Sequence, residues 1–204
     1  MKTDSLDFLL SPAEPQTAQA LKEWQVAVDA LVQGETILLL RKGGLRETEG
    51  KFAVEQGQVV LYPTYEHQKP QGLKLKYATQ VQPVESGWHP ETVPIRAWAK
   101  ITEAFQVSDR DRLMALLPLH IWTEDFVVER FRWKPKQPLS VLLLRVYRLS
   151  QPQTIAYLPA YGGCKSWIEL AEPINLGNSV PVLDDQAYQA RAAEIRAIVA
   201  GSQT

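Results

Sequence analysis

Two runs of aliphatic residues constrain the fold of this chain more than any other feature. Residues 37–40 are all aliphatic, and residues 139–149 are apolar at nearly every position before Arg145. Short continuous apolar runs are typical of strands buried on both faces, whereas half-buried strands alternate with polar residues. Both runs are far shorter than a membrane span. We therefore predict that they form buried strands of one sheet.

Further strands are predicted from turns and from alternation. Residues 51–55 and 58–62 predict a hairpin that turns at Gln56-Gly57. Residues 154–158 and 166–170 predict a closing pair of strands. Residues 73–77 alternate strictly and predict an edge strand with its lysines outward, and residues 95–105 alternate as well.

Helices are predicted where apolar residues recur at helical spacing and where capping residues precede them. Residues 17–32 predict the first helix, which Gly34 ends. Ser108, with Asp111 three residues on, predicts a capped second helix. Residues 121–131 predict a third helix, and Asp184 or Asp185 caps a final one.

These elements predict an α+β fold, with a mixed, largely antiparallel sheet and N-terminal, central and C-terminal helices packed on it. We expect an N-terminal arm over residues 1–17 and a single globular α+β domain over residues 18–171. A subdivision near residue 106 is the alternative. Residues 172–204 are expected to be a linker and the C-terminal helix.

Charge is distributed unevenly along a chain whose total is nearly neutral. The 204 residues carry a formal net charge of −1, which argues against a general nucleic-acid or membrane binder. Residues 128–148, however, hold one acid, Glu129, against six basic side chains: Arg130, Arg132, Lys134, Lys136, Arg145 and Arg148. Since Cys164 is the only cysteine, and the N-terminal apolar run is too short for a signal peptide, we expect a reducing, cytoplasmic location without membrane association.

The first candidate site follows the buried strand at residues 37–40. Arg41 and Lys42 stand at the strand end, and Gly43 and Gly44 follow them. Two cations beside glycine N–H groups are suited to hold a phosphate or a carboxylate. The alternative is a tight turn with solvated charges.

The second candidate site is the sequence Tyr65-Glu66-His67-Gln68. Glu66 and His67 could act as a base and its partner, or as metal ligands together with Glu23, Glu47 or Glu55. A nuclease of the restriction-enzyme type would need further clustered carboxylates, and the Glu-x-Lys or Asp-x-Lys sequence of that class is missing. The alternative is a short turn that Thr64 caps.

Two further segments combine features of binding sites. Arg130, Arg132 and Lys134 alternate with aromatic residues, which suits backbone phosphates and stacked bases. An acidic protein partner would also fit, and a solvated connector whose Trp133 packs inward is the alternative. Cys164 follows two glycines, and we expect a small buried cysteine rather than a catalytic thiol.

The order of several sequences resembles a known bacterial family, filed as domain of unknown function 1802. They are ALKEWQVAVDAL, ILLLRKGG, FAVE, LYPTYEHQ, RAWAKITEAF, LPLHIWTEDFVVERFRWKP, LSVLLLRVYRL and YGGCKSWIEL. The resemblance covers about residues 18–171 and implies that this stretch is one unit. It also implies that residues 41–68 and 162–167 are hallmarks of the family. No activity is established for that family, so none is carried over.

The function that these features favour is binding of an anion, either nucleic acid or a phosphorylated ligand. The predicted basic pocket contains Arg41, Lys42 and His67, with Gly43, Gly44, Arg130, Arg132 and Lys134 as further binding residues. One alternative is a metal-assisted, nuclease-like hydrolase that uses Glu23, Glu66 and His67. The other is a protein-interaction scaffold without a ligand site. No cofactor follows from the sequence, no metal site is assigned, and whether the protein is an enzyme stays open.

Overall fold

The computed structural model describes residues 15–42, 47–48, 51–52 and 57–201. Its strands are β1 (Gln16–Trp24), β2 (Leu38–Arg41), β3 (Glu47–Thr48), β4 (Lys51–Phe52), β5 (Gln58–Thr64), β6 (Thr92–Val107), β7 (Leu139–Ala156), β8 (Trp167–Asn175) and β9 (Val180–Pro181). Its α-helices are α1 (Gln25–Val32), α2 (Leu75–Ala78), α3 (Arg110–Ala115), α4 (Glu124–Arg132) and α5 (Asp185–Ala200). Short 3₁₀ helices are η1 (Pro70–Gly72), η2 (Leu117–Leu119) and η3 (Pro159–Tyr161).

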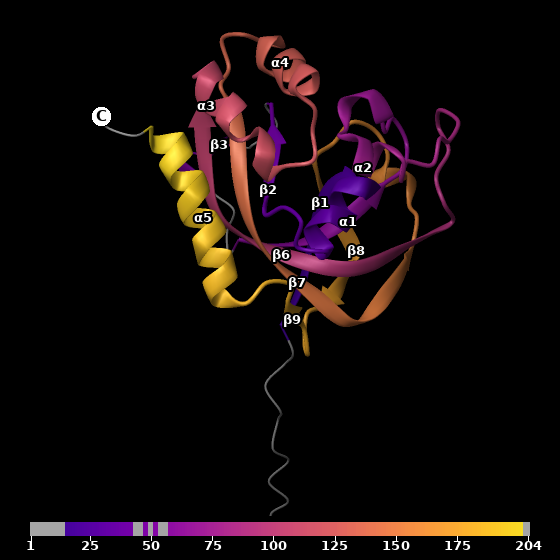
Figure 1. The fold of residues 1–204 in the computed structure, drawn as a ribbon. Coiled ribbons are helices and arrows are strands. Elements are labelled where there is room, and N and C mark those ends of the chain that lie inside the picture. Colours follow the sequence, from indigo (N-terminus) through magenta and orange to yellow (C-terminus); the bar gives the residue numbers. More distant parts are fainter. Residues whose placement is uncertain (1–14, 43–46, 49–50, 53–56, 202–204) are drawn as a thin grey trace, which may run out of the picture.

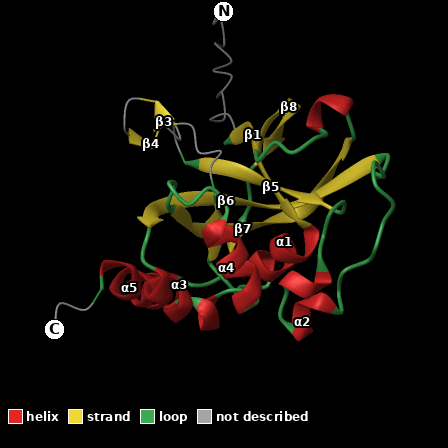
Figure 2. Cartoon of the chain, turned by 90° about the horizontal axis from the view of Figure 1, so that it is seen from above, coloured by secondary structure: helices red, strands yellow, loops and turns green. Residues whose placement is uncertain are grey.

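A mixed sheet forms the centre of the molecule (Figure 1). In the described residues its strand order is β2-β7-β6-β5-β1-β8, with β9 paired to β7. The pairing of β1 with β5 is parallel and the other pairs are antiparallel. Figure 2 shows α1 to α5 gathered on one side of the strands. The predicted α+β class with a largely antiparallel sheet is therefore confirmed.

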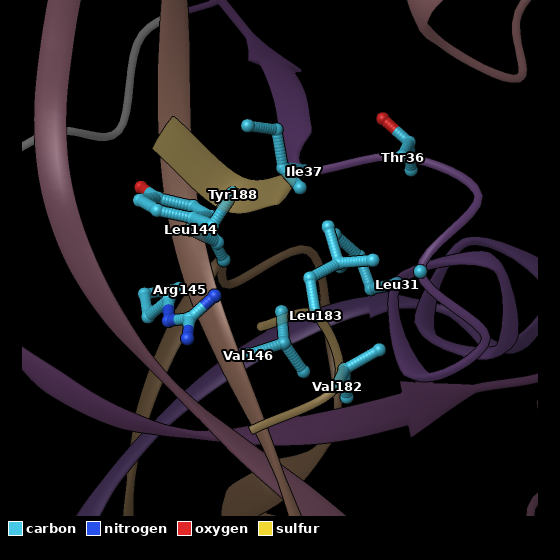
Figure 3. Close-up of a pocket in the computed structure, with 10 residues that line it drawn as sticks. Leu31, Thr36, Ile37, Leu144, Arg145, Val146, Val182, Leu183 and Tyr188 are labelled. Atoms are coloured by element: carbon cyan, nitrogen blue, oxygen red, sulfur yellow. The ribbon is translucent and has the colours of Figure 1, made fainter. Parts of the chain in front are cut away.

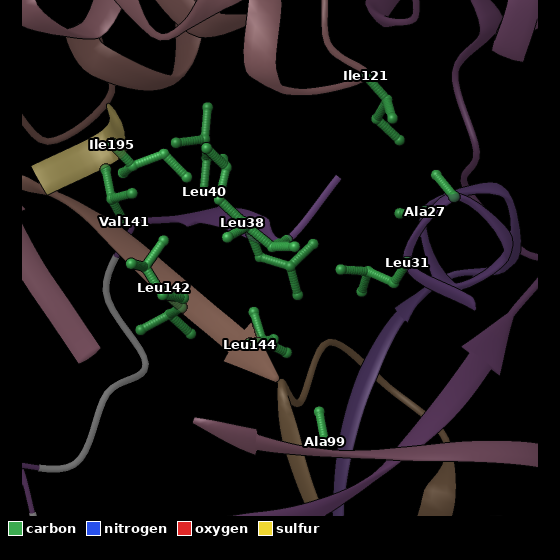
Figure 4. Close-up of a cluster of buried hydrophobic side chains, with 14 of the residues drawn as sticks. Ala27, Leu31, Leu38, Leu40, Ala99, Ile121, Val141, Leu142, Leu144 and Ile195 are labelled. Atoms are coloured by element: carbon green, nitrogen blue, oxygen red, sulfur yellow. The ribbon is translucent and has the colours of Figure 1, made fainter. Parts of the chain in front are cut away.

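The core lies where the predicted aliphatic strands meet the helices (Figure 4). Residues 141–144 of β7 are fully buried, and β2 pairs with them from Leu38↔Leu143 to Arg41↔Ser140. The inner face of α5, formed by Tyr188, Ala192, Ile195 and Val199, belongs to the same cluster. The Asp184 side chain caps this helix by accepting the Ala187 N–H at 2.7 Å. The buried strands and the final helix thus form as predicted.

The predicted first helix is wrong in its N-terminal half, because residues 16–24 form β1. Main-chain hydrogen bonds to β5 on one edge and to β8 on the other hold this segment extended. Ala20, Leu21 and Lys22 are buried in succession, as in a strand covered on both faces. Tertiary pairing therefore outweighs the helical spacing of the apolar residues, and the helix begins only at Gln25.

The predicted edge strand at residues 73–77 is also wrong. Leu73 forms a single bridge with Trp122, and α2 begins at Leu75. The Lys74 ammonium group turns inward and donates to the carbonyl oxygens of Leu117 and His120, both at 2.5 Å. The alternation of apolar and charged residues thus occurs here in a short helix. Its first residue, Leu75, is 80% exposed, so the alternation does not separate a buried face from a solvent face.

Other predicted elements form with different boundaries or partners. In the described residues β4 pairs with β3, and β5 pairs with β1 and β6; residues 53–56, which hold most of the first strand of the predicted hairpin, lie outside the described part. Residues 154–156 extend β7 along β6, while β8 pairs with β1, so the predicted closing pair is wrong. Asp109 rather than Ser108 caps α3, and Thr123 caps α4.

None of the helices in the described ranges is long and apolar enough to cross a membrane.

Leu142→Ala should destabilise the protein strongly, because this fully buried side chain would leave a cavity between β7 and the helices. We expect the free energy of unfolding in urea to fall by about 2–5 kcal/mol. The control is Leu75→Ala, whose side chain is 80% exposed and should change stability by less than about 0.5 kcal/mol. Equal effects of the two substitutions would contradict the assigned core.

Acid should destabilise the protein through His120. Burial lowers the pKa of this imidazole from 6.5 to about 3, and its Nδ1 accepts the Trp122 N–H at 3.2 Å. The unfolded chain therefore binds a proton that the folded protein does not, and stability falls as the pH drops from 6.5 towards 3. We expect roughly 3 kcal/mol to be lost between about pH 7 and pH 4 because of this group.

His120→Asn keeps an acceptor for the Trp122 N–H but does not titrate. Urea unfolding at both pH values should therefore show a smaller acid loss in His120→Asn than in the wild type. The exposed His89 provides the control, since His89→Asn should retain the full loss. An identical pH dependence of His120→Asn and the wild type would refute the assignment.

Candidate functional site

The parallel pairing of β1 with β5 places the carboxyl ends of both strands at one edge of the sheet. Glu23 lies opposite Pro63 and Trp24 opposite Thr64, and the Thr64 hydroxyl donates to the Glu23 carbonyl oxygen at 3.0 Å. The end of β2 reaches the same place, because Nη2 of Arg41 donates to the Lys22 carbonyl oxygen at 2.6 Å. Three strand ends thus converge here, in a position where folds commonly carry binding sites.

A largely buried ion pair lies at the centre of this convergence. Nη2 of Arg41 is 3.0 Å from Oε2 of Glu23, and the two side chains are 15% and 9% exposed. The other carboxylate oxygen of Glu23 accepts the Trp24 N–H at 2.8 Å. Nη1 of Arg41 donates to the Ser166 hydroxyl at 3.4 Å, while its buried Nε has no hydrogen-bond partner. The Arg41 guanidinium is therefore fixed in orientation and only partly satisfied.

A second guanidinium, that of Arg130 in α4, lies within electrostatic range of this ion pair. Burial lowers its pKa most, Glu23 and the neighbouring Glu129 raise it, and Arg41 lowers it. The guanidinium carbon of Arg130 lies 4.9 Å from the centre of the Phe126 ring. In the part of the chain that the structure describes, no hydrogen bond or ion pair holds Arg130. Arg41 is thus ion-paired with Glu23, whereas Arg130 is influenced by Glu23 and Glu129 only at longer range.

Lys42 has a structural contact in this arrangement. Its ammonium group is buried, donates to the Phe131 carbonyl oxygen at 2.8 Å and lies 5.4 Å from the Phe131 ring centre. Burial lowers its pKa. The last carbonyl groups of a helix have no hydrogen-bond donor within the helix, and a lysine ammonium group can supply one. Lys42 thus fastens the C-terminal turn of α4 over the end of β2 (Figure 1). Gly43 and Gly44 lie outside the described residues.

Glu66 and His67 form a separate cluster. Nε2 of His67 lies 3.1 Å from Oε1 of Glu66, and the same oxygen accepts the Gly87 N–H at 2.6 Å. That N–H lowers the pKa of Glu66 most, and the positive charge of Lys22 contributes. Because Lys22 and Glu23 are adjacent in a strand, their side chains point to opposite faces. In the described residues no hydrogen bond or ion pair joins His67, which is 64% exposed, to Arg41.

The three side chains of the alternative, metal-assisted hydrolase do not gather. Both carboxylate oxygens of Glu23 are engaged, by Arg41 and by the Trp24 N–H, and Glu66 pairs with His67. Within the described ranges, no three His, Cys, Asp or Glu side chains are placed to hold a metal ion together. The Thr64 hydroxyl is used by the Glu23 carbonyl group and caps no turn.

Sequence reasoning did not find the role of Lys22. Its ammonium group is buried and donates to the carbonyl oxygens of Tyr161 and Gly163, at 2.5 and 2.9 Å. Burial lowers its pKa. Lys22 thereby fixes the loop that carries Ser166, the hydroxyl that Arg41 contacts. A cation directly after the apolar pair Ala20-Leu21 is the usable signal, but it was hidden because the segment was predicted to be helical. Cys164 in this loop is exposed, not buried as expected.

The connector after α4 exposes its charged and aromatic side chains. Arg132, Lys134 and Lys136 are exposed, and Trp133 is 49% exposed instead of packing inward. The Lys134 ammonium group lies 4.6 Å from the centre of the Trp133 ring. The predicted basic and aromatic surface is therefore present next to Arg130.

A small cavity lies elsewhere, between α5 and the strands (Figure 3). It is lined by Thr36, Arg145, Tyr188 and apolar side chains, and its volume of about 10 Å³ is close to what one water molecule needs. The Arg145 guanidinium is satisfied by the Asp184 carbonyl oxygen at 3.0 Å and by Asp185 at 2.8 Å. This cavity is too small for a ligand.

Glu23→Gln should destabilise the protein, because the buried Arg41 guanidinium would lose its counter-charge. We expect a loss of about 3 kcal/mol in urea unfolding, and a smaller loss when Arg41→Met is also present. The control is Glu103→Gln, which breaks a more exposed pair: Glu103 is 25% exposed and its partner Arg196 is 41% exposed. That change should cost less than about 1 kcal/mol. Additive effects of Glu23→Gln and Arg41→Met would show that the pair is not coupled.

Comparison with known proteins identifies a family. No curated protein matches the chain. Among solved structures it is similar to the ASCH protein of Zymomonas mobilis, with 14% identity over 86% of this chain and 93% of that chain, and a TM-score of 0.45. Two point mutants of that protein match with 12% and 13% identity, over 86% and 89% of this chain and 96% and 98% of theirs, with TM-scores of 0.44 and 0.43. The sequence profile of a domain of unknown function, DUF1802, matches residues 20–194. The chain belongs to the DUF1802 family.

Proposed function

We propose that this protein binds a phosphate-bearing anion, either nucleic acid or a phosphorylated ligand, at the Arg41–Arg130 pair. The observation that carries the proposal is the charge balance of this cluster. Arg41 is paired with Glu23, and Arg130, which lies within electrostatic range of Glu23 and Glu129, has no hydrogen-bond or ion-pair partner in the described residues. A bound anion would supply the missing negative charge.

The chemistry of guanidinium groups favours phosphate as the bound group. Guanidinium presents N–H donors in a planar fork that matches phosphate oxygens, and these charge-assisted hydrogen bonds are stronger than neutral ones. Arg41 is already oriented by Glu23 and by the Lys22 carbonyl oxygen, so little side-chain entropy remains to be lost on binding. Arg130 is partly exposed and can therefore meet a ligand from solvent.

The remaining predicted binding residues take secondary roles in this proposal. Arg132 and Lys134 extend the positive surface along the connector. Lys42 holds the end of α4, and hence Arg130, in place through the Phe131 carbonyl oxygen. His67 belongs to the Glu66 cluster and makes no direct contact in the proposed site. No observation in the described residues favours the metal-assisted hydrolase.

Arg130→Met tests the proposal with inorganic tripolyphosphate as the probe in isothermal titration calorimetry. Because Arg130 holds no polar group within the described ranges, its replacement should leave the fold intact. We expect the affinity to fall about tenfold or more, as for the loss of a charge-assisted contact. The wild-type affinity should also fall with added NaCl and be indifferent to a chelator.

Arg110→Met is the matched control, since it removes the same charge from an exposed side chain of α3. It should bind tripolyphosphate as the wild type does. Equal affinities of Arg130→Met and Arg110→Met would refute the proposed site, and so would a wild-type protein that does not bind the probe.

A further inference from the structure

Trp133 is an exposed aromatic side chain held in an ordered connector. The backbone N–H of Trp133 donates to the Glu129 carbonyl oxygen at 3.0 Å, so the main chain at Trp133 continues from the last turn of α4. Lys134 then adopts a left-handed conformation with φ of 50°, and the Gln137 N–H closes the turn on the Lys134 carbonyl oxygen at 2.9 Å. The indole is therefore presented to solvent on a fixed backbone.

The Trp133 ring is large and well exposed. Tryptophan gains much from burial, yet Trp133 leaves 49% of its surface in water. The Lys134 ammonium group lies over the ring at 4.6 Å, so a cation already covers part of the indole. An exposed ring among Arg130, Arg132 and Lys134 combines a stacking surface with charges for phosphates.

We propose that Trp133 stacks against a nucleobase while Arg130 and Arg41 hold the adjoining backbone phosphate, so that the ligand is single-stranded nucleic acid. This inference rests on the proposed function. Aromatic side chains beside basic residues are the means by which proteins bind single strands without reading sequence. Bases in a duplex are stacked on each other and leave no face free for the indole.

The positions of the two side chains suit such a ligand. Arg130 precedes Trp133 by three residues at the end of α4, which is about 5 Å along the helix axis. One nucleotide can therefore contact both side chains. An acidic peptide or a phosphorylated small molecule without an aromatic ring would satisfy the cations but would leave the indole without a partner. The exposed tryptophan thus favours a ligand that carries bases.

Trp133→Ala and Trp133→Phe test the inference by fluorescence anisotropy of a labelled oligothymidylate with the full-length protein. We expect Trp133→Ala to weaken binding about tenfold and Trp133→Phe to restore most of it, since phenylalanine keeps a stacking face. Tripolyphosphate binding should be unchanged by Trp133→Ala. The control is Trp88→Ala, which removes an equally exposed ring, 46%, that packs edge-on against Tyr65 in the other cluster. Trp88→Ala should leave the oligothymidylate affinity as it is.

Three results would overturn the inference. The first is an unchanged oligothymidylate affinity in Trp133→Ala, the second is equal affinity for a duplex, and the third is equal competition by polyglutamate. The proposed function stands through each of them if Arg130→Met still loses tripolyphosphate. If the wild type does not bind tripolyphosphate, the proposed function fails, and the inference fails with it.

Discussion

The parallel pairing of β1 with β5 is the constraint on which the rest of the structure depends. In an otherwise antiparallel sheet, it brings two carboxyl ends to one edge, so that Glu23 and Thr64 lie side by side. It also makes β1 an internal strand, flanked by β5 and β8. A polar side chain at its end is consequently taken out of water, and the Glu23 carboxylate needs the partner that Arg41 provides.

Burial also explains why the cations of this region have different roles. Lys22 and Lys42 are deeply buried, and each ammonium group is used on main-chain carbonyl oxygens of a neighbouring loop or helix. Because a buried ammonium ion must be satisfied, these lysines fix the walls of the site and are not available to a ligand. Arg130 rests on the Phe126 ring, which supplies attraction without using its N–H donors. The main chain around the Glu23–Arg41 pair is therefore held in place by Lys22 and Lys42, and Arg130 retains its hydrogen-bonding capacity.

The sequence could predict what depends on local pattern. The aliphatic runs at 37–40 and 141–144, and the helix after Asp184, follow from periodicity and capping, and they form as expected. The position of Arg41 at the end of β2 follows from a local signal, a charge directly after an aliphatic run. The strand β1 was missed because its hydrogen-bond partners lie far away in the chain, and Lys42 looked like a ligand contact because nothing local shows that α4 packs on it. The exposure of Trp133 likewise depends on where α4 ends.

Stability and binding are separable in this arrangement, because they fall to different guanidinium groups. Arg41 is bound to Glu23 and to the Lys22 carbonyl oxygen, so the folded sheet depends on it. Arg130 makes no such contact in the described residues, so the fold gains little from its charge and bears the cost of its partial desolvation. The proposed function assigns this charge to a second molecule. The contrast between the ion-paired Arg41 and Arg130, which has no polar partner in the described residues, is the feature that supports that proposal.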